Sequence, residues 1–290
     1  MTPIVQSLAE ISDRYDALFC DLWGCLHNGI APFPDAVAAL QGFRARGGKV
    51  VLLTNAPRPR ADVARQLDGM GVPRDAWDTI ATSGDSARLA MFQGIVGTSV
   101  YHIGEPRDAT FFEPLGLIED CPEIIRVPLT EAQGIVCTGP FDAHADPAVN
   151  RPDFLYAKEK GLKLLCANPD VVVDRGKTRE WCAGALAELY IEMGGESLYF
   201  GKPHPPVYDL ARRRLAELGD MTADARILAI GDGIATDIKG ALGEDIDSLF
   251  VTGGLAAAET CTARDPEQEA LTQFLSHAQI TPTYAIGLLR

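Results

Sequence analysis

Four short polar segments of the chain carry the residue types best suited to chemistry, and each follows an apolar run. Together they supply carboxylates, an ammonium, a hydroxyl and an amide: Asp21, Thr54, Asn55, Lys202, Asp232 and Asp237. Converging carboxylates repel one another unless a hard cation lies between them, and Mg²⁺ typically takes one or two carboxylates plus water and phosphate oxygens. Lysine supplies a point charge for phosphate, and hydroxyl and N–H donors complete the cradle. The set therefore predicts a magnesium-dependent phosphoryl-transfer site centred on Asp21.

Short apolar runs and helical patterns alternate around these segments. Strands are predicted at 17–21, 50–54, 79–82, 226–230 and 248–251, and helices at 34–46, 60–70, 206–218 and 236–242. Such alternation produces right-handed crossovers and a parallel sheet with helices on both faces. Ligands of open parallel sheets bind beyond the carboxyl ends of the strands, so the polar segments should converge there. We therefore predict an α/β fold with a Rossmann-like parallel-sheet core.

The middle of the chain carries a second set of elements. Strands are predicted at 99–103, 134–138 and 162–167, helices at 152–160 and 179–193, and a strand at 198–200 that leads into Lys202. This pattern predicts an α/β domain of residues 91–197 that is inserted into a core of residues 1–90 and 198–290.

Composition restricts the partners and the compartment. The 290 residues carry a net charge of −14, and such an acidic surface repels nucleic acid and anionic membranes. Seven cysteines are scattered without a C-x-x-C pair, which argues against a disulfide framework or a structural zinc site. No apolar run reaches the roughly 18 residues of a membrane span, and the start lacks a signal-peptide pattern. A cytoplasmic location is expected.

The order and the neighbours of the polar segments resemble the motifs of the haloacid dehalogenase-like hydrolase superfamily. The matching stretches are Asp21-Leu-Trp-Gly-Cys-Leu-His-Asn-Gly, Leu53-Thr-Asn, Gly201-Lys-Pro-His and Gly231-Asp-Gly-Ile-Ala-Thr-Asp-Ile. Thr82-Ser-Gly and Asn168-Pro-Asp add similarity to the class IIA branch, which has a large α/β cap and includes NagD-like and 4-nitrophenylphosphatase-like enzymes. The resemblance extends over nearly the whole chain.

The resemblance implies catalytic and phosphate-binding roles. Asp21 would be the nucleophile that forms an aspartyl-phosphate intermediate, and Lys202 would stabilise both Asp21 and the transferring group. Thr54 and the amide of Asn55 would bind the phosphate. The inserted domain would be a cap that closes over a small phosphorylated metabolite and excludes water.

The resemblance also implies a set of metal ligands. Asp21, the backbone carbonyl of Trp23 and Asp232 would hold Mg²⁺, while Asp237 would hold a metal-bound water or orient Lys202. In relatives with this cap type, the cap often mediates dimer formation, so a homodimer through the cap is a further expectation.

Position 23 departs from the pattern of the superfamily's phosphatases. They carry a second Asp there, which protonates the leaving oxygen, whereas Trp23 has an indole N–H that only donates. Loss of such acid–base help typically costs about 10²–10⁴ in rate. The enzyme is then slow or restricted to leaving groups that need no proton, or His27 supplies the proton, or the site binds a phosphorylated ligand without rapid turnover.

Other function classes lack their motifs. The chain has no G-x-G-x-x-G after a strand, no G-x-x-x-x-G-K-[ST] and no G-x-S-x-G. These absences argue against a nucleotide-dependent oxidoreductase, a P-loop NTPase and a serine hydrolase. The remaining rival is a non-catalytic or weakly catalytic protein that binds a phosphorylated ligand at a retained metal site.

Overall fold

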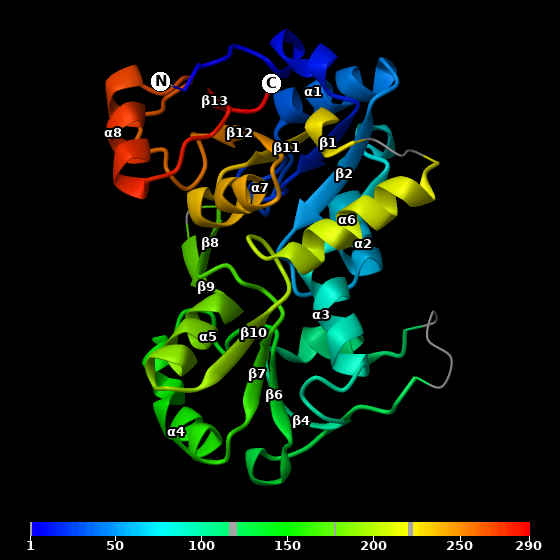
Figure 1. The fold of residues 1–290 in the computed structure, drawn as a ribbon, viewed down its shortest axis with the longest axis vertical. Helices are drawn as coiled ribbons and strands as arrows, with labels where there is room; N and C mark the ends of the chain where they lie inside the picture. Colours follow the sequence, from blue (N-terminus) through cyan, green and yellow to red (C-terminus); the bar gives the residue numbers. More distant parts are fainter. Residues whose placement is uncertain (1, 116–120, 177, 220–222) are drawn as a thin grey trace.

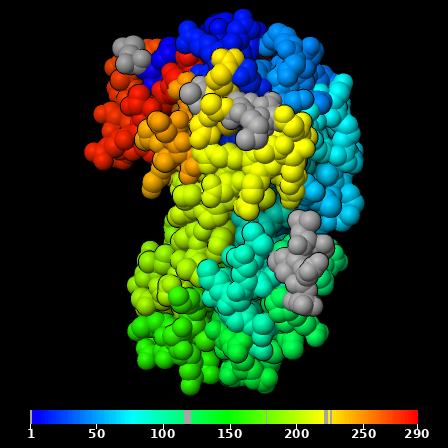
Figure 2. Space-filling model, turned by 45° about the vertical axis from the view of Figure 1, so that its right-hand side comes forward, coloured from blue at the N-terminus to red at the C-terminus, as the bar shows by residue number. Residues whose placement is uncertain are grey.

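Two parallel sheets, one in each of two lobes, organise the chain (Figure 1). The computed structural model describes residues 2–115, 121–176, 178–219 and 223–290. Figure 2 shows that the surface is indented between the lobes, and both termini lie in the lobe drawn at the top of Figure 1. Among the helices of the described residues, none is long and apolar enough to cross a membrane.

The first sheet has six strands in the order β13-β12-β11-β1-β2-β3, and every neighbouring pair is parallel. The strands are β1 (Ala17–Cys20), β2 (Lys49–Thr54), β3 (Thr79–Thr82), β11 (Ile227–Gly231), β12 (Asp247–Val251) and β13 (Tyr284–Ile286). The helices of this lobe are α1 (Pro34–Ala45), α2 (Arg60–Gly69), α6 (Pro205–Glu217), α7 (Lys239–Gly243) and α8 (Gln268–Ala278).

Both faces of this sheet are covered, which explains its continuous apolar strands. Leu18 and Cys20 of β1 pack with residues of α1 and α2, whereas Ala17 and Phe19 pack with residues of α6 and α7. Alternate side chains of a strand point to opposite faces, so a run of four buried residues serves two cores. The predicted α/β fold with a parallel-sheet core is confirmed.

The second sheet has five parallel strands in the order β10-β7-β6-β4-β5. They are β4 (Ser99–Ile103), β5 (Ile125–Arg126), β6 (Gly134–Cys137), β7 (Lys163–Cys166) and β10 (Glu196–Tyr199). Helices α4 (Arg151–Glu159) and α5 (Ala183–Glu192) pack on one face, while α3 (Ser83–Phe92) and the 3-10 turn Pro106–Phe112 pack on the other. An antiparallel hairpin, β8 (Val172–Arg175) and β9 (Thr178–Trp181), lies between the lobes (Figure 1).

Most predicted elements agree with the structure, and one is partly wrong. The helix predicted at 179–193 begins only at Ala183, because residues 178–181 form strand β9. Arg and Glu suit helices, yet here they are consecutive residues of a mostly exposed hairpin strand. The divisions expected after residues 90 and 197 stay a proposal: α3 extends across the first, and β10 of the second sheet extends across the other.

Candidate active site

A buried lysine links two carboxylates at the carboxyl end of the first sheet. Asp21 follows β1 directly, and Lys202 Nζ lies 2.6 Å from Asp21 Oδ1 and 2.7 Å from Asp237 Oδ1. The same ammonium donates to the Leu53 carbonyl over 3.0 Å. Lys202 is 2% exposed, so all these interactions are shielded from water. The sequence prediction that these side chains converge is confirmed by the geometry.

Lys202 reaches this place by a route that the sequence did not indicate. The strand before it, β10, belongs to the second sheet, so Lys202 lies where the chain returns to the first lobe. The side chain of Asn55 fixes this return: its Oδ1 accepts from Lys202 N over 2.7 Å, and its Nδ2 donates to Lys202 O over 3.1 Å. A Cβ added at Gly201 would lie 2.4 Å from Asn55 Oδ1 and 2.5 Å from Ser83 Oγ, so the crossing segments are closely packed.

Oxygen atoms suited to a hard cation gather beside Asp21. Ligand atoms of Asp21, Cys25 and Asp232 all lie within 4.8 Å of one another. Gly24 makes room for this group: its φ is +72°, and a Cβ there would lie 2.1 Å from Asp232 Oδ2. Burial, the largest effect, and nearby carboxylates raise the pKa of the Cys25 thiol well above its usual value, so Cys25 stays protonated. The remaining donors, the carboxylates of Asp21 and Asp232, fit a hard divalent cation such as Mg²⁺.

Burial disfavours the ionised forms of the site's carboxylates. Burial raises the pKa of Asp21 to about 7; Lys202 opposes this rise, and Asp237 adds to it. Burial, with the charges of Asp21 and Asp237, raises the pKa of Asp232 well above its ordinary value. A bound divalent cation would favour the ionised forms and so reverse both shifts.

Asp237 is occupied by protein donors. It lies on a π-helical turn, Ile234–Ile238, where its Oδ2 accepts from Gly233 N over 3.1 Å and from Thr236 Oγ1 over 3.3 Å. Its Oδ1 holds the Lys202 ammonium. Asp237 was expected either to hold a metal-bound water or to orient Lys202. This geometry favours the second role.

The remaining predicted residues lie at the end of β2 and in the segment after β1. Thr54 is 1% exposed, and its Oγ1 accepts from Ala56 N over 3.2 Å. His27 is also 1% exposed, its Nδ1 accepts from Gly29 N over 3.0 Å, and burial lowers its pKa to about 4. Because burial keeps the His27 ring neutral near pH 7 and Gly29 N occupies its Nδ1, we leave His27 out of the proposed site.

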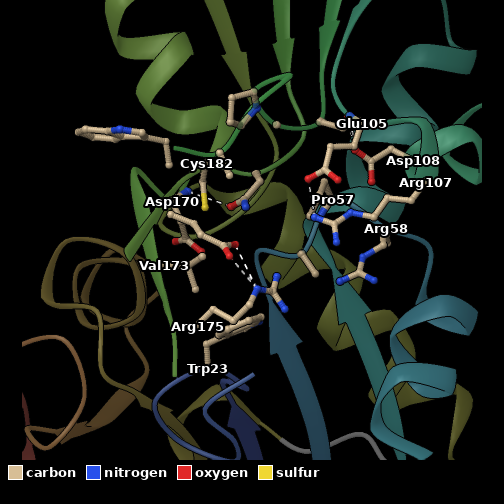
Figure 3. Close-up of a pocket in the computed structure, with 18 residues that line it drawn as sticks. Trp23, Pro57, Arg58, Glu105, Arg107, Asp108, Asp170, Val173, Arg175 and Cys182 are labelled. Carbon is tan, nitrogen blue, oxygen red and sulfur yellow. Dashed lines mark hydrogen bonds and ion pairs between the residues drawn. The ribbon is translucent and has the colours of Figure 1, made fainter. Parts of the chain in front are cut away.

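Two adjoining pockets open at the site. The first, here called the carboxylate pocket, is lined by Asp21, Lys202, Asp232 and Asp237 among others. The second, here called the arginine chamber, lies toward the second sheet and is lined by three arginines among others: Arg58, Arg107 and Arg175 (Figure 3). Trp23, Asp170 and Val173 line both, so the pockets adjoin across these residues.

Trp23 and Asp170 form the boundary between the pockets. The Arg175 guanidinium lies 5.2 Å from the Trp23 ring, and a Cβ at Gly29 would lie 2.2 Å from that ring. Asp170 Oδ1 accepts from Asn55 Nδ2 over 2.8 Å, which connects the second lobe to the first. Burial raises the pKa of Asp170, against the charge of Lys202 and this hydrogen bond. The sequence signal for Asp170 was the turn Asn168-Pro-Asp, and that for Arg175 was a basic cluster with Arg179, whereas Arg58 and Arg107 had no motif.

Comparisons with known proteins agree with this geometry. The family model described as haloacid dehalogenase-like hydrolase matches residues 18–118, and a HAD-hydrolase-like model matches residues 199–278. A crystal structure of a haloacid dehalogenase-like hydrolase from Brucella suis is 37% identical, with a TM-score of 0.86 over 99% of this chain and 100% of that one.

Two curated enzymes are similar over most of their length. The D-glycerol 3-phosphate phosphatase of Mycobacterium tuberculosis is 27% identical over 89% of this chain and 69% of its own. The ribonucleotide monophosphatase NagD of Escherichia coli is 22% identical over 83% of this chain and 89% of its own. The chain therefore belongs to the haloacid dehalogenase-like hydrolase family, in the class IIA branch of NagD-like phosphatases.

Proposed function

We propose that the protein hydrolyses phosphate monoesters of small metabolites, with Asp21 as nucleophile and Mg²⁺ as cofactor. The observation that carries the proposal is the buried contact of 2.6 Å between Asp21 and Lys202, at the edge of a cluster of oxygen donors that includes Asp232. A buried ammonium between carboxylates neutralises charge where a phosphate dianion would enter.

Each residue then has a defined task. A carboxylate oxygen of Asp21 attacks phosphorus, the bond to the leaving oxygen breaks, and an aspartyl phosphate forms. Water then attacks this phosphate and restores the carboxylate. Lys202 stabilises the transferring group, Asp237 orients Lys202, and Asn55 fixes the backbone of Lys202. The Thr54 hydroxyl and the Asn55 amide are proposed as phosphate donors.

Asp21, Asp232 and the carbonyl of Trp23 would hold Mg²⁺. The ion supplies positive charge against the phosphate oxygens and keeps the carboxylates ionised. This second effect matters because burial raises the pKa of Asp21 to about 7, and a protonated Asp21 is a poor nucleophile.

The absence of a carboxylate at Trp23 restricts the substrates. The indole N–H does not titrate in a useful range, and buried His27, with a pKa of about 4, carries no proton to give near neutral pH. We therefore propose slow turnover of alkyl phosphates and faster turnover where the leaving group needs no proton, as in aryl or acyl phosphates. The same observation favours a second candidate, a protein that binds a phosphorylated ligand with little turnover.

Phosphate release from 4-nitrophenyl phosphate, with and without Mg²⁺, tests the proposal beside the Asp21→Asn variant. We expect Mg²⁺-dependent release that Asp21→Asn abolishes. Release that persists in Asp21→Asn would refute the nucleophile. No release from any ester, together with stabilisation by phosphorylated ligands in thermal melts, would favour the binding protein.

The proposal has three further parts: the domain division, the oligomeric state and the location. Residues 91–197 form the cap, and residues 1–90 and 198–290 form the core. A homodimer through the cap is proposed because Leu155 of α4 and Ile191 of α5 are exposed, and light scattering after gel filtration tests it.

A cytoplasmic location is proposed because all seven cysteines are free, several of them buried, and free thiols are typical of a reducing compartment.

A further inference from the structure

The arginine chamber brings three arginines together in a protein whose net charge is −14. Its arginines come from separate parts of the chain: Arg58 lies between β2 and α2, Arg107 on the turn Pro106–Phe112, and Arg175 at the end of β8. Figure 3 shows them arranged around the same open space. Four carboxylates also line the chamber, so what it can bind depends on which arginine lacks a carboxylate partner.

Arg58 is the arginine whose charge is least compensated. Arg107 donates to Glu105 over 2.6 Å, and Arg175 donates to Glu180 over 2.9 Å. Arg58 donates to the neutral side chain of Gln66 over 2.8 Å, and it forms no ion pair within the described ranges.

The surroundings make this charge costly. Burial lowers the pKa of Arg58, and the positive charges of Arg107 and Arg175 act in the same direction, against Asp62 and Asp108. A half-buried guanidinium without a bonded counter-ion is unfavourable unless a ligand supplies one. An unmatched positive charge in this chamber is therefore that of Arg58, which an anionic group of a ligand would compensate.

The carboxylates of the chamber do not require an added cation, because each already has a hydrogen-bond donor. Glu105 and Glu180 are held by their arginines. Asp108 accepts from Thr138 Oγ1 over 2.8 Å, and Asp170 accepts from Asn55 Nδ2 over 2.8 Å. Every carboxylate of the chamber therefore has a donor, whereas Arg58 has only an amide acceptor.

We propose that the arginine chamber binds an anionic substituent on the leaving group of the substrate, with Arg58 as its principal partner. The inference rests on the proposed hydrolysis at Asp21 and names its substrate class: phosphate monoesters that carry a second oxyanion, a carboxylate or another phosphate. Trp23 and Asp170 line both pockets, so a substrate that extends from one pocket into the other would pass between Asp21 and Arg58. Guanidinium binds either oxyanion through paired hydrogen bonds, which a lysine cannot do.

The test compares short alkyl phosphates with counterparts that end in a carboxylate, a second phosphate or an ammonium. We expect kcat/KM for the better oxyanion series to exceed that of the alkyl series by about 10- to 100-fold, the size of a charge-assisted contact. The carboxylate and bisphosphate arms show which oxyanion is preferred. Equal values in all arms, or a preference for the ammonium, would overturn the inference.

Variants of Arg58 test whether this residue causes the preference for substrates with a second oxyanion. Arg58→Gln should remove most of the preference and Arg58→Lys should keep part of it. Arg213→Gln should leave the preference intact, because Arg213 is an exposed residue of α6 that donates to Asp209 O of its own helix. A preference that survives in Arg58→Gln, or that falls equally in Arg213→Gln, would refute the role of Arg58.

Phosphonate analogues separate this inference from the proposed hydrolysis. If the protein releases phosphate from no ester, the proposed hydrolysis is wrong. Carboxyalkylphosphonates or bisphosphonates should even then raise the melting temperature more than alkylphosphonates. Arg58→Gln should cancel that difference. Equal melting shifts in the unmodified protein would overturn the anion site by itself.

Discussion

Replacement of Lys202 by Met would remove the cation that contacts Asp21 and Asp237 while it keeps most of the side-chain volume. Lys202 is 2% exposed and donates to Asp21, Asp237 and the Leu53 carbonyl. Breaking a buried ion pair from one side typically costs about 3–5 kcal/mol, a large part of the stability of a folded domain. We expect a loss of that size in the free energy of unfolding, and no phosphate release.

The loss should depend on pH. Lys202 holds down the pKa of the buried Asp21, so without it the folded state binds protons more tightly than the unfolded chain. Stability then falls as pH rises above the unfolded pKa, and the loss should be larger at about pH 8 than at about pH 5. Urea unfolding in the presence of a chelator measures both values.

Lys163→Met is the matched control. Lys163 also pairs with a carboxylate, Glu196 at 2.9 Å, but both side chains are about half exposed. Such a surface pair contributes about 0–1 kcal/mol. If Lys202→Met cost no more than Lys163→Met at either pH, the buried charge cluster would not have the energetic role derived above.

Three further outcomes follow from the same site. Trp23→Asp should raise phosphate release from alkyl phosphates by up to about 10²–10⁴, and no gain would count against a missing general acid. Gly24→Ala should lower the free energy of urea unfolding by more than Gly94→Ala does. Both glycines have positive φ, but of the two only a Cβ at Gly24 would meet Asp232, at 2.1 Å. Equal losses would contradict this steric reason. Mg²⁺ should raise the melting temperature more at about pH 8 than at about pH 5, because the pKa of Asp21 is raised to about 7 and a protonated carboxylate binds the ion poorly; equal shifts would exclude Asp21 as a ligand.

The buried strands were the most predictable part of the fold. The predicted strands at 79–82 and 99–103 coincide with β3 and β4, because apolar runs of such length are stable only inside a covered sheet. The hairpin β8–β9 was not predicted, since its charged side chains are partly or fully exposed and its partner strand decides its conformation. The start of α5 was misplaced for the same reason.

The site was predictable where motif and strand end coincide, as at Asp21. The path of Lys202 was not, because a strand before a motif does not reveal which sheet it joins. The arginine chamber is equally absent from local patterns: Arg58, Arg107 and Arg175 are far apart in sequence, and only the packing of the lobes brings them to one space. Contacts between residues that are far apart in the chain leave no periodic pattern in the sequence.

The crossing segments at Gly201 and Ser83 have a mechanical consequence. Ser83 begins α3, which leaves the first lobe, and Gly201 follows β10, which returns to it, so both crossings pass through one point. Any rotation between the lobes has its axis near that point, and displacement grows with distance from an axis. The ammonium of Lys202, one residue along, would then travel little. Such a rotation would change the space between the lobes and leave the contacts of Lys202 with Asp21 and Asp237 in place.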